Sequence, residues 1–166
     1  MRSSAVGSVT EFPPEPIGLK EQIQRVLDGN RFAVLATQNA GQPHASLMAF
    51  TPVGGLRYLV FATYRGTLKY RNLLEDERLA VLIEDRNTDQ AQAKRGIVLT
   101  AIGKAIEIPD AERAAAVSAH LARHPDLEEF IRSPDCAVLR MAVTAYQVVG
   151  GIEDVRWYQM EGSTTT

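Results

Sequence analysis

Three consecutive segments in the first part of the chain favour β-structure, and only short turns separate them. The segments are residues 31–38, 44–51 and 56–63, each rich in apolar and β-favouring side chains. The turns between them, residues 39–43 and 52–55, contain the asparagine, glycine and proline typical of tight turns. Strands joined by such short connections pair with their sequence neighbours. This part of the chain is therefore predicted to form an antiparallel meander.

The remainder of the chain adds further strands, with helices inserted at irregular positions. Strands are predicted over residues 78–84, 96–108 and 136–149, with a short one around 155–160. Helices are predicted over residues 17–27, 67–75, 110–124 and 127–131. This order lacks the strand-helix alternation of a parallel sheet. We expect a mainly β fold in which six or more antiparallel strands close into a barrel, with short helices at its edges.

Length and composition favour one soluble domain. The chain has 166 residues, of which 45% are hydrophobic, and a formal net charge of −2. We expect a flexible arm over residues 1–16, a domain over 17–160 and a polar tail over 161–166. The charge argues against nucleic acid or a membrane surface as a partner. No apolar run is long enough to span a membrane, no secretory signal is recognised and only one cysteine occurs, which favours a cytoplasmic location.

Most catalytic motifs are absent from the sequence. His120 and His124 lie four residues apart, but no third ligand is nearby, and their place in the last turn of a predicted helix favours a solvated face over a metal site. Cys136 begins an apolar strand without a basic neighbour, so it is not expected to be a nucleophile. Neither a serine nucleophile elbow nor a glycine-rich nucleotide motif is found.

One segment, residues 61–73, combines hydroxyl groups and cations at a predicted helix start. Thr67 lies where the helix begins, with Arg65 and Lys69 on either side. Free backbone N–H groups beside two cations suit a phosphate group. The alternative is a surface loop with ordinary solvated charges. The residues alone leave both interpretations open.

The same segment resembles the pyridoxamine 5′-phosphate oxidase-related family of FMN-binding split barrels. The resemblance rests mainly on residues 59–83, and extends to residues 41–48, 103–105 and 149–157. It implies a split β-barrel and non-covalently bound FMN. It further implies phosphate or ribityl contacts from Thr63, Thr67 and Lys69, a backbone contact at Ala62, and a strand along the flavin ring formed by Ser46, Leu47 and Met48. Leu68 occupies the position of a phosphate-binding arginine of the family, so Arg65 or Arg71 is expected to supply that charge.

The resemblance also implies a homodimer, because in this family the flavin lies between two subunits. Trp157 is a candidate for the aromatic ring that borders the cofactor, with a packing anchor as the alternative reading. His44 is expected to face an exposed turn rather than the ring.

The function implied is that of an FMN-dependent oxidoreductase acting on an unidentified small molecule. Residues 156–160 do not match the pyridoxine-binding residues of the vitamin oxidase. The alternatives on the same fold are a flavin or haem binding protein without turnover and a deazaflavin-dependent reductase. Haem-degrading relatives ligate iron through a histidine near the C-terminus, and no histidine follows His124 here.

Overall fold

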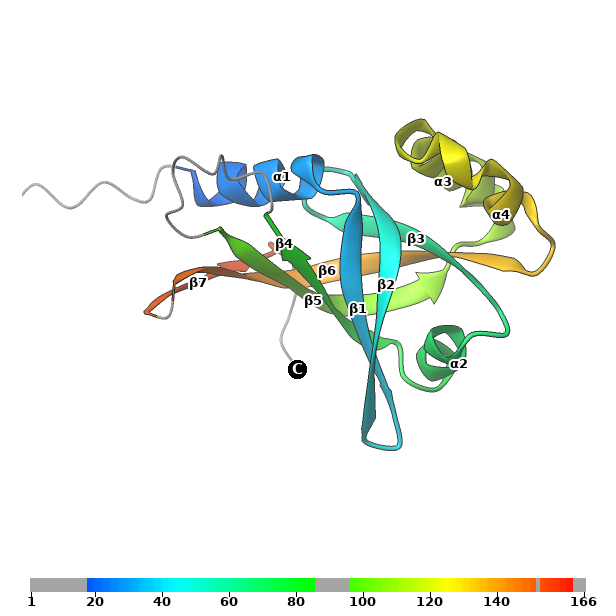
Figure 1. Cartoon of the computed structure of the whole chain (residues 1–166), viewed down its shortest axis with the longest axis horizontal. Helices are drawn as coiled ribbons and strands as arrows, with labels where there is room; N and C mark the ends of the chain where they lie inside the picture. The colour runs from blue at the N-terminus through cyan, green and yellow to red at the C-terminus, as the bar shows by residue number, and fades with distance from the viewer. Residues whose placement is uncertain (1–17, 86–95, 152, 163–166) are drawn as a thin grey trace, which may run out of the picture.

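A computed structural model describes residues 18–85, 96–151 and 153–162 (Figure 1). The strands are β1 (Phe32–Asn39), β2 (Gln42–Val53), β3 (Tyr58–Tyr64), β4 (Arg78–Glu84), β5 (Val98–Glu107), β6 (Cys136–Gly151) and β7 (Asp154–Gln159). The helices are α1 (Leu19–Gly29), α2 (Leu68–Glu75), α3 (Asp110–Arg123), the short 3₁₀ turn η2 (Pro125–Leu127) and α4 (Glu128–Arg132). No helix within these ranges is both long and apolar enough to cross a membrane.

The strands form one antiparallel sheet that closes into a barrel. Its order is β3-β2-β1-β4-β5-β6-β7, and an additional pairing of β3 with β6 joins six of the strands into a closed ring. The predicted fold class is therefore confirmed. Strand β7 lies outside the ring, against the C-terminal half of β6.

A bulge in β6 marks the place where the barrel splits. Residues of β6 up to Ala142 pair with β3, and those from Ala145 onward pair with β7. Between them the β5–β6 register shifts next to Gly103, where a Cβ atom would lie 2.1 Å from the carbonyl oxygen of Ala142. Only glycine allows the two backbones to approach so closely. A bulge increases the local bend of a strand, which lets β6 serve both partners.

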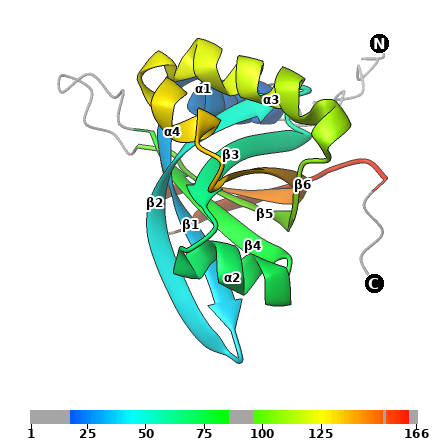
Figure 2. The ribbon, with the colours of Figure 1, turned by 90° about the vertical axis from the view of Figure 1, so that its right-hand side faces the viewer.

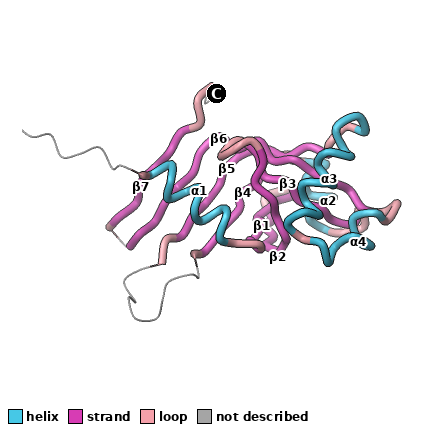
Figure 3. Tube along the Cα trace, turned by 90° about the horizontal axis from the view of Figure 1, so that it is seen from above, coloured by secondary structure: helices cyan, strands magenta, loops and turns pink. Residues whose placement is uncertain are grey.

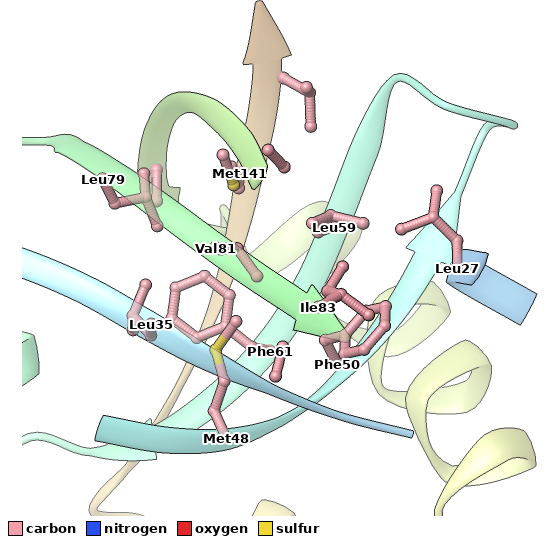
Figure 4. Close-up of a cluster of buried hydrophobic side chains, with 14 of the residues drawn as sticks. Leu27, Leu35, Met48, Phe50, Leu59, Phe61, Leu79, Val81, Ile83 and Met141 are labelled. Atoms are coloured by element: carbon pink, nitrogen blue, oxygen red, sulfur yellow. The ribbon is translucent and has the colours of Figure 1, made fainter. Parts of the chain in front are cut away.

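The core fills the barrel interior because alternate residues of each strand point inward. Strand β1 alternates between exposed and buried positions along most of its length, which is the period of two expected of a half-buried strand. Figure 4 shows large side chains from several strands meeting in the interior, among them Leu35, Phe50, Phe61 and Val81. Helix α1 adds Ile23, Val26 and Leu27 to this core.

Helices α2, α3 and α4 lie toward one end of the barrel, as Figure 3 shows, and Figure 2 shows α2 on the other side of the strands from α3 and α4. Helix α3 packs on β2, β3 and β6, while α2 lies beside β1. A second, smaller apolar cluster joins α3 and α4 to the strands below them; its buried members are Val60, Ile108, Ile131, Cys136 and Val138.

The structure corrects the predicted turn between the first two strands and the predicted place of His44. The β1–β2 turn is confined to Ala40 and Gly41, both with positive φ, so β2 begins two residues earlier than predicted. His44 is therefore not in a turn: it lies within β2 opposite Thr37 and is half-buried. The predicted arm over residues 1–16, the residues 86–95 between two predicted strands, and the end of the predicted tail lie outside the described residues.

Candidate cofactor-binding site

A pocket of about 360 Å³ opens between the β2–β3 surface, the start of α2 and the α3–α4 region. We call it the β2–β3 pocket. Its lining comes from six strands and helices (β1, β2, β3, α2, α3 and α4) and from the turn before α4: Phe32, Leu47, Met48, Ala49, Ala62, Thr63, Tyr64, Thr67, Lys69, His120, Leu127 and Phe130. Six of the nine residues predicted to hold a cofactor line this single pocket. Ser46, Arg65 and Trp157 do not.

Thr67 organises the α2 end of the pocket. It is the N-cap residue of α2, and its hydroxyl oxygen accepts a hydrogen bond from the backbone N–H of Tyr70. The same hydroxyl donates to the carbonyl oxygen of Tyr64 at 2.8 Å, so the remaining contact, with the Thr63 hydroxyl at 2.9 Å, has Thr63 as its donor. The two threonines predicted from the sequence are thus locked together where β3 ends and α2 begins.

Lys69 brings a positive charge to this end. Its ammonium group donates to the carbonyl oxygen of Leu47 at 3.4 Å, which holds the side chain across the gap between α2 and β2. The side chain is half-buried, and this burial lowers the pKa of Lys69 from its usual value. Among the described residues, no carboxylate pairs with it. The pocket therefore contains a partly desolvated cation that has no counter-ion within the part of the chain that the structure describes.

The guanidinium of Arg65, by contrast, points away from the pocket. It forms an ion pair with Glu107 and donates to the carbonyl oxygens of Pro134 at 3.1 Å and Cys136 at 3.2 Å. Tyr70 donates to the other carboxylate oxygen of Glu107 at 2.8 Å. Arg65 thus ties the start of α2 to β5 and β6. Neither it nor Arg71 lines the pocket in place of the arginine missing at position 68.

Ser46 and Trp157 also lie off the pocket wall. Ser46 is half-buried, and its hydroxyl group has no hydrogen-bond partner among the described residues. Trp157 lies on β7 opposite Gln147 with half of its surface exposed. It therefore does not border the β2–β3 pocket of its own chain.

His120 lies at the α3–α4 end of the pocket, where no site was predicted. It is only 1% exposed, and its Nδ1 lies 2.9 Å from the hydroxyl oxygen of Thr51. Its Nε2 is also buried and has no hydrogen-bond partner within the described residues. Burial, together with the nearby His124 and Arg123, lowers the pKa of His120 to about 4, so the imidazole is neutral at pH 7.

The predicted solvated face for His120 and His124 is therefore wrong. His124 is fully buried, and its Nε2–H donates to the carbonyl oxygen of Phe50 at 2.8 Å. Both rings lie on the side of α3 that packs against the barrel. The spacing of Ala116, Val117, His120 and His124 follows a helical stripe, a signal that outweighs position in the last turn.

The rest of this end is apolar and aromatic. Tyr64 and Phe130 meet edge to face, with ring centroids 4.8 Å apart and an interplanar angle of 84°. Phe32 and Leu127 complete the wall. Sequence reasoning missed these residues and Ala49. Phe32, Leu127 and Phe130 come from segments that only the fold brings together, whereas Tyr64 and Ala49 directly follow the predicted Thr63 and Met48.

The described residues supply no nucleophile or metal centre for this pocket. Burial raises the pKa of the Cys136 thiol, which disfavours the reactive thiolate. No group of three metal-ligating side chains occurs among them. The pocket is suited to binding: it has an apolar wall, one cation with hydroxyl groups at one end, and one neutral imidazole at the other.

Comparison with known proteins finds relatives of this chain in sequence and in fold. The chain is 32% identical over 98 residues to a pyridoxamine 5′-phosphate oxidase homologue of Schizosaccharomyces pombe, covering 54% of this chain and 48% of the relative. This chain thus spans about half the length of that curated relative.

Among solved structures, a haem-binding protein from Mycobacterium smegmatis superposes with a TM-score of 0.76 at 24% identity, covering 84% of this chain and 57% of that one. An FAD-binding protein from Mesorhizobium loti superposes with a TM-score of 0.61 at 18% identity, covering 76% and 90% of the two chains. These similarities show a shared fold. The family model described as pyridoxamine 5′-phosphate oxidase matches residues 19–150, and the chain therefore belongs to the pyridoxamine 5′-phosphate oxidase family.

Proposed function

We propose that this protein binds FMN in the β2–β3 pocket and acts as an oxidoreductase on a small molecule. The observation that carries the proposal is Lys69, a partly buried cation without a carboxylate partner among the described residues, next to the capped start of α2. A bound flavin would supply the electron transfer. The protein's part is to bind and orient it.

The α2 end of the pocket fits a phosphate group. The Lys69 ammonium has three N–H donors and gives one of them to Leu47, which leaves two for phosphate oxygens. The backbone N–H groups of Leu68 and Lys69, in the first turn of α2, have no acceptor inside the helix. Thr67 orients this turn by capping it, so its own hydroxyl serves the helix. A phosphate dianion would also offset the burial of the Lys69 charge.

The remaining wall fits a flat heteroaromatic ring. Leu47 and Ala49, which are alternate residues of β2, form one apolar side of the pocket, with Phe32 and Phe130 nearby, while the Met48 side chain belongs to the barrel core. A ring system is stabilised by such a surface through the loss of apolar area from water. The FAD-binding relative from Mesorhizobium loti supports a flavin in this fold.

We further propose that the protein is a homodimer, with a second copy covering an apolar row beside the pocket. Leu47, Val34 and Leu82 are neighbours in register across β2, β1 and β4, and they are 68%, 37% and 42% exposed. Three large aliphatic side chains in one exposed row favour contact with a partner. Because Leu47 also lines the pocket, a subunit placed on this row would narrow the pocket opening.

Light scattering coupled to size exclusion tests the dimer. The expected mass of the wild-type protein is twice that of the 18.2 kDa chain. Leu82 does not line the pocket, and Leu82→Glu is expected to lower the measured mass toward that of a single chain. A wild-type protein that binds FMN and has the mass of one chain would contradict the shared-interface proposal.

Haem is the second candidate ligand, and His120 is the observation that favours it. A buried, neutral imidazole with a free Nε2 has the form of an iron ligand, and the Mycobacterium smegmatis relative is a haem-binding protein. One feature favours flavin instead: Lys69, which has no carboxylate partner among the described residues, matches a phosphate group.

Absorbance spectra of the purified protein, alone and titrated with FMN, a deazaflavin and haemin, test the proposal. We expect saturable FMN binding at one flavin per chain and no specific haemin spectrum. The flavin assignment would be overturned if the protein did not bind FMN but bound haemin with an iron-ligand absorbance band that His120→Phe abolishes. Preferential binding of the deazaflavin would replace FMN by that cofactor in the same pocket.

A further inference from the structure

We propose that His120 is a specificity-determining residue that hydrogen-bonds through Nε2 to the neutral polar edge of the ring bound in the β2–β3 pocket. The inference rests on the flavin function proposed above. It assigns the α3–α4 end of the pocket to the ring and the α2 end to the phosphate.

The first argument is the state of the two imidazole nitrogens. Nδ1 is held at 2.9 Å by the Thr51 hydroxyl, which fixes the ring in place. Nε2 is enclosed and has no partner among the described residues, although the ring forms part of the pocket wall. A buried polar atom left without a hydrogen bond is costly, so such atoms in native proteins usually have a reason.

His124 provides an internal comparison one helical turn later. Its Nε2–H donates to the Phe50 carbonyl oxygen, and its Nδ1 lies 3.5 Å from a guanidinium nitrogen of Arg31. Both nitrogens are thus occupied within the protein, and His124 does not line the pocket. His124 thus shows what we expect of a histidine with a purely structural role, namely that both ring nitrogens have partners within the protein. His120 differs from it in that its buried Nε2 has no hydrogen-bond partner among the described residues, and in that it is part of the pocket lining.

The second argument concerns the kind of group that His120 can bind. The Thr51 hydroxyl can accept from Nδ1–H or donate to Nδ1, so either tautomer of His120 is compatible with this contact. Nε2 can therefore donate to a ring carbonyl or accept from a ring N–H. The pyrimidine edge of a flavin carries both kinds of group.

The charges around His120 disfavour an ionic role. His124 and Arg123 lie on the same helix, Thr51 faces the ring from β2, and no carboxylate is among the groups that shift its titration. Arg123 is engaged with the carbonyl oxygens of Leu27, Asp28 and Asn30. A neutral imidazole suits a neutral heterocycle, whereas an anionic group finds its cation at Lys69.

The closing experiment uses riboflavin and FMN as probes and observes the histidines directly. Protein labelled with ¹⁵N-histidine is titrated with riboflavin, and the imidazole nitrogens of His44, His120 and His124 are followed by NMR. We expect Nε2 of His120 to shift on binding, while both nitrogens of His124 stay in place. Because this measurement uses the wild-type protein, it does not depend on a variant that folds.

Binding to variants provides the second readout. His120→Phe is expected to weaken riboflavin and FMN by the same factor, roughly tenfold, which is the usual effect of one lost hydrogen bond. Thr51→Val removes only the support of the ring and is expected to have a smaller effect on both ligands. Melting temperatures of both variants report any loss of folding.

The outcomes separate this inference from the function on which it rests. Flavin binding without a change at His120, in the spectra or in the affinities, would overturn the role of His120 and leave the flavin proposal standing. A wild-type protein that binds neither FMN nor riboflavin would overturn both.

Discussion

The two ends of the β2–β3 pocket differ in chemistry and in how the chain builds them. The α2 end is made from a short stretch of sequence, with Thr63, Thr67 and Lys69 within seven residues, and it holds a cation. The α3–α4 end joins His120, Leu127 and Phe130 to β1 and β2, and its titratable histidine is held neutral. The comparison indicates that one end recognises charge and the other recognises shape and a neutral hydrogen-bonding edge.

The largest expected effect concerns acid and the His120 end. Burial holds the folded pKa of His120 near 4, below the ordinary 6.5, so the unfolded chain binds this proton first as the pH falls. The free energy of unfolding should therefore decrease between pH 6.5 and pH 4, by about 3 kcal/mol from this group. His124, whose pKa is also lowered by burial, acts in the same direction.

Urea unfolding at several pH values checks this expectation. His120→Phe is the matched variant, because carboxylates such as Asp76 titrate in both proteins. The difference between wild type and variant should shrink as the pH falls. An identical pH dependence in the two proteins would mean that His120 is already solvated.

A smaller effect is expected at the α2 end from the helix cap. Thr67→Ala removes a hydroxyl that contacts Thr63, Tyr64 and Tyr70, and should lower the free energy of unfolding by about 1 kcal/mol. Thr67→Ser keeps the hydroxyl and is the control. Equal stabilities of the alanine and serine variants, measured by urea unfolding, would show that the cap contributes nothing.

The smallest effect on stability and FMN affinity is expected for a substitution of Arg65. This substitution tests whether Arg65 belongs to the α2 end of the pocket. Arg65 pairs with Glu107 at a partly exposed site, so Arg65→Ala should cost roughly 1 kcal/mol of stability or less. FMN affinity should stay within about twofold, because the guanidinium does not line the pocket. Glu107→Gln serves as the matched variant. A tenfold loss of FMN affinity in Arg65→Ala alone would place this arginine on the phosphate.

The contrast between the two ends also explains what could be predicted from the sequence. The strands follow from alternating burial and turn residues, which are local properties, and the barrel follows from their order. Thr67 and Lys69 are two positions apart, so their place in one site could also be predicted from the sequence. Arg65 was assigned to the phosphate because it is close in sequence, but its partner Glu107 lies 42 positions away.

The α3–α4 end could not be assembled in this way. Phe32 and Phe130 are almost a hundred positions apart, and nothing local indicates that they share a wall. His120 was placed in solvent because a histidine in the last turn of a helix favours the helix dipole. Packing of α3 on β2 outweighed that preference. The helical stripe that includes Ala116 and Val117 was the sequence signal that this face of α3 is buried.

The most direct measurement of the central claim is the affinity of FMN and riboflavin for wild type, Lys69→Ala and Lys20→Ala, by flavin fluorescence. Lys20 is an exposed lysine of α1, so its variant changes the net charge equally at a distance. Loss of a charge-assisted contact of roughly 1.5 to 3 kcal/mol predicts that Lys69→Ala weakens FMN by about one to two decades and leaves riboflavin nearly unchanged. Equal weakening of both ligands, or of neither, would contradict a phosphate at Lys69 and with it the assignment of the two ends.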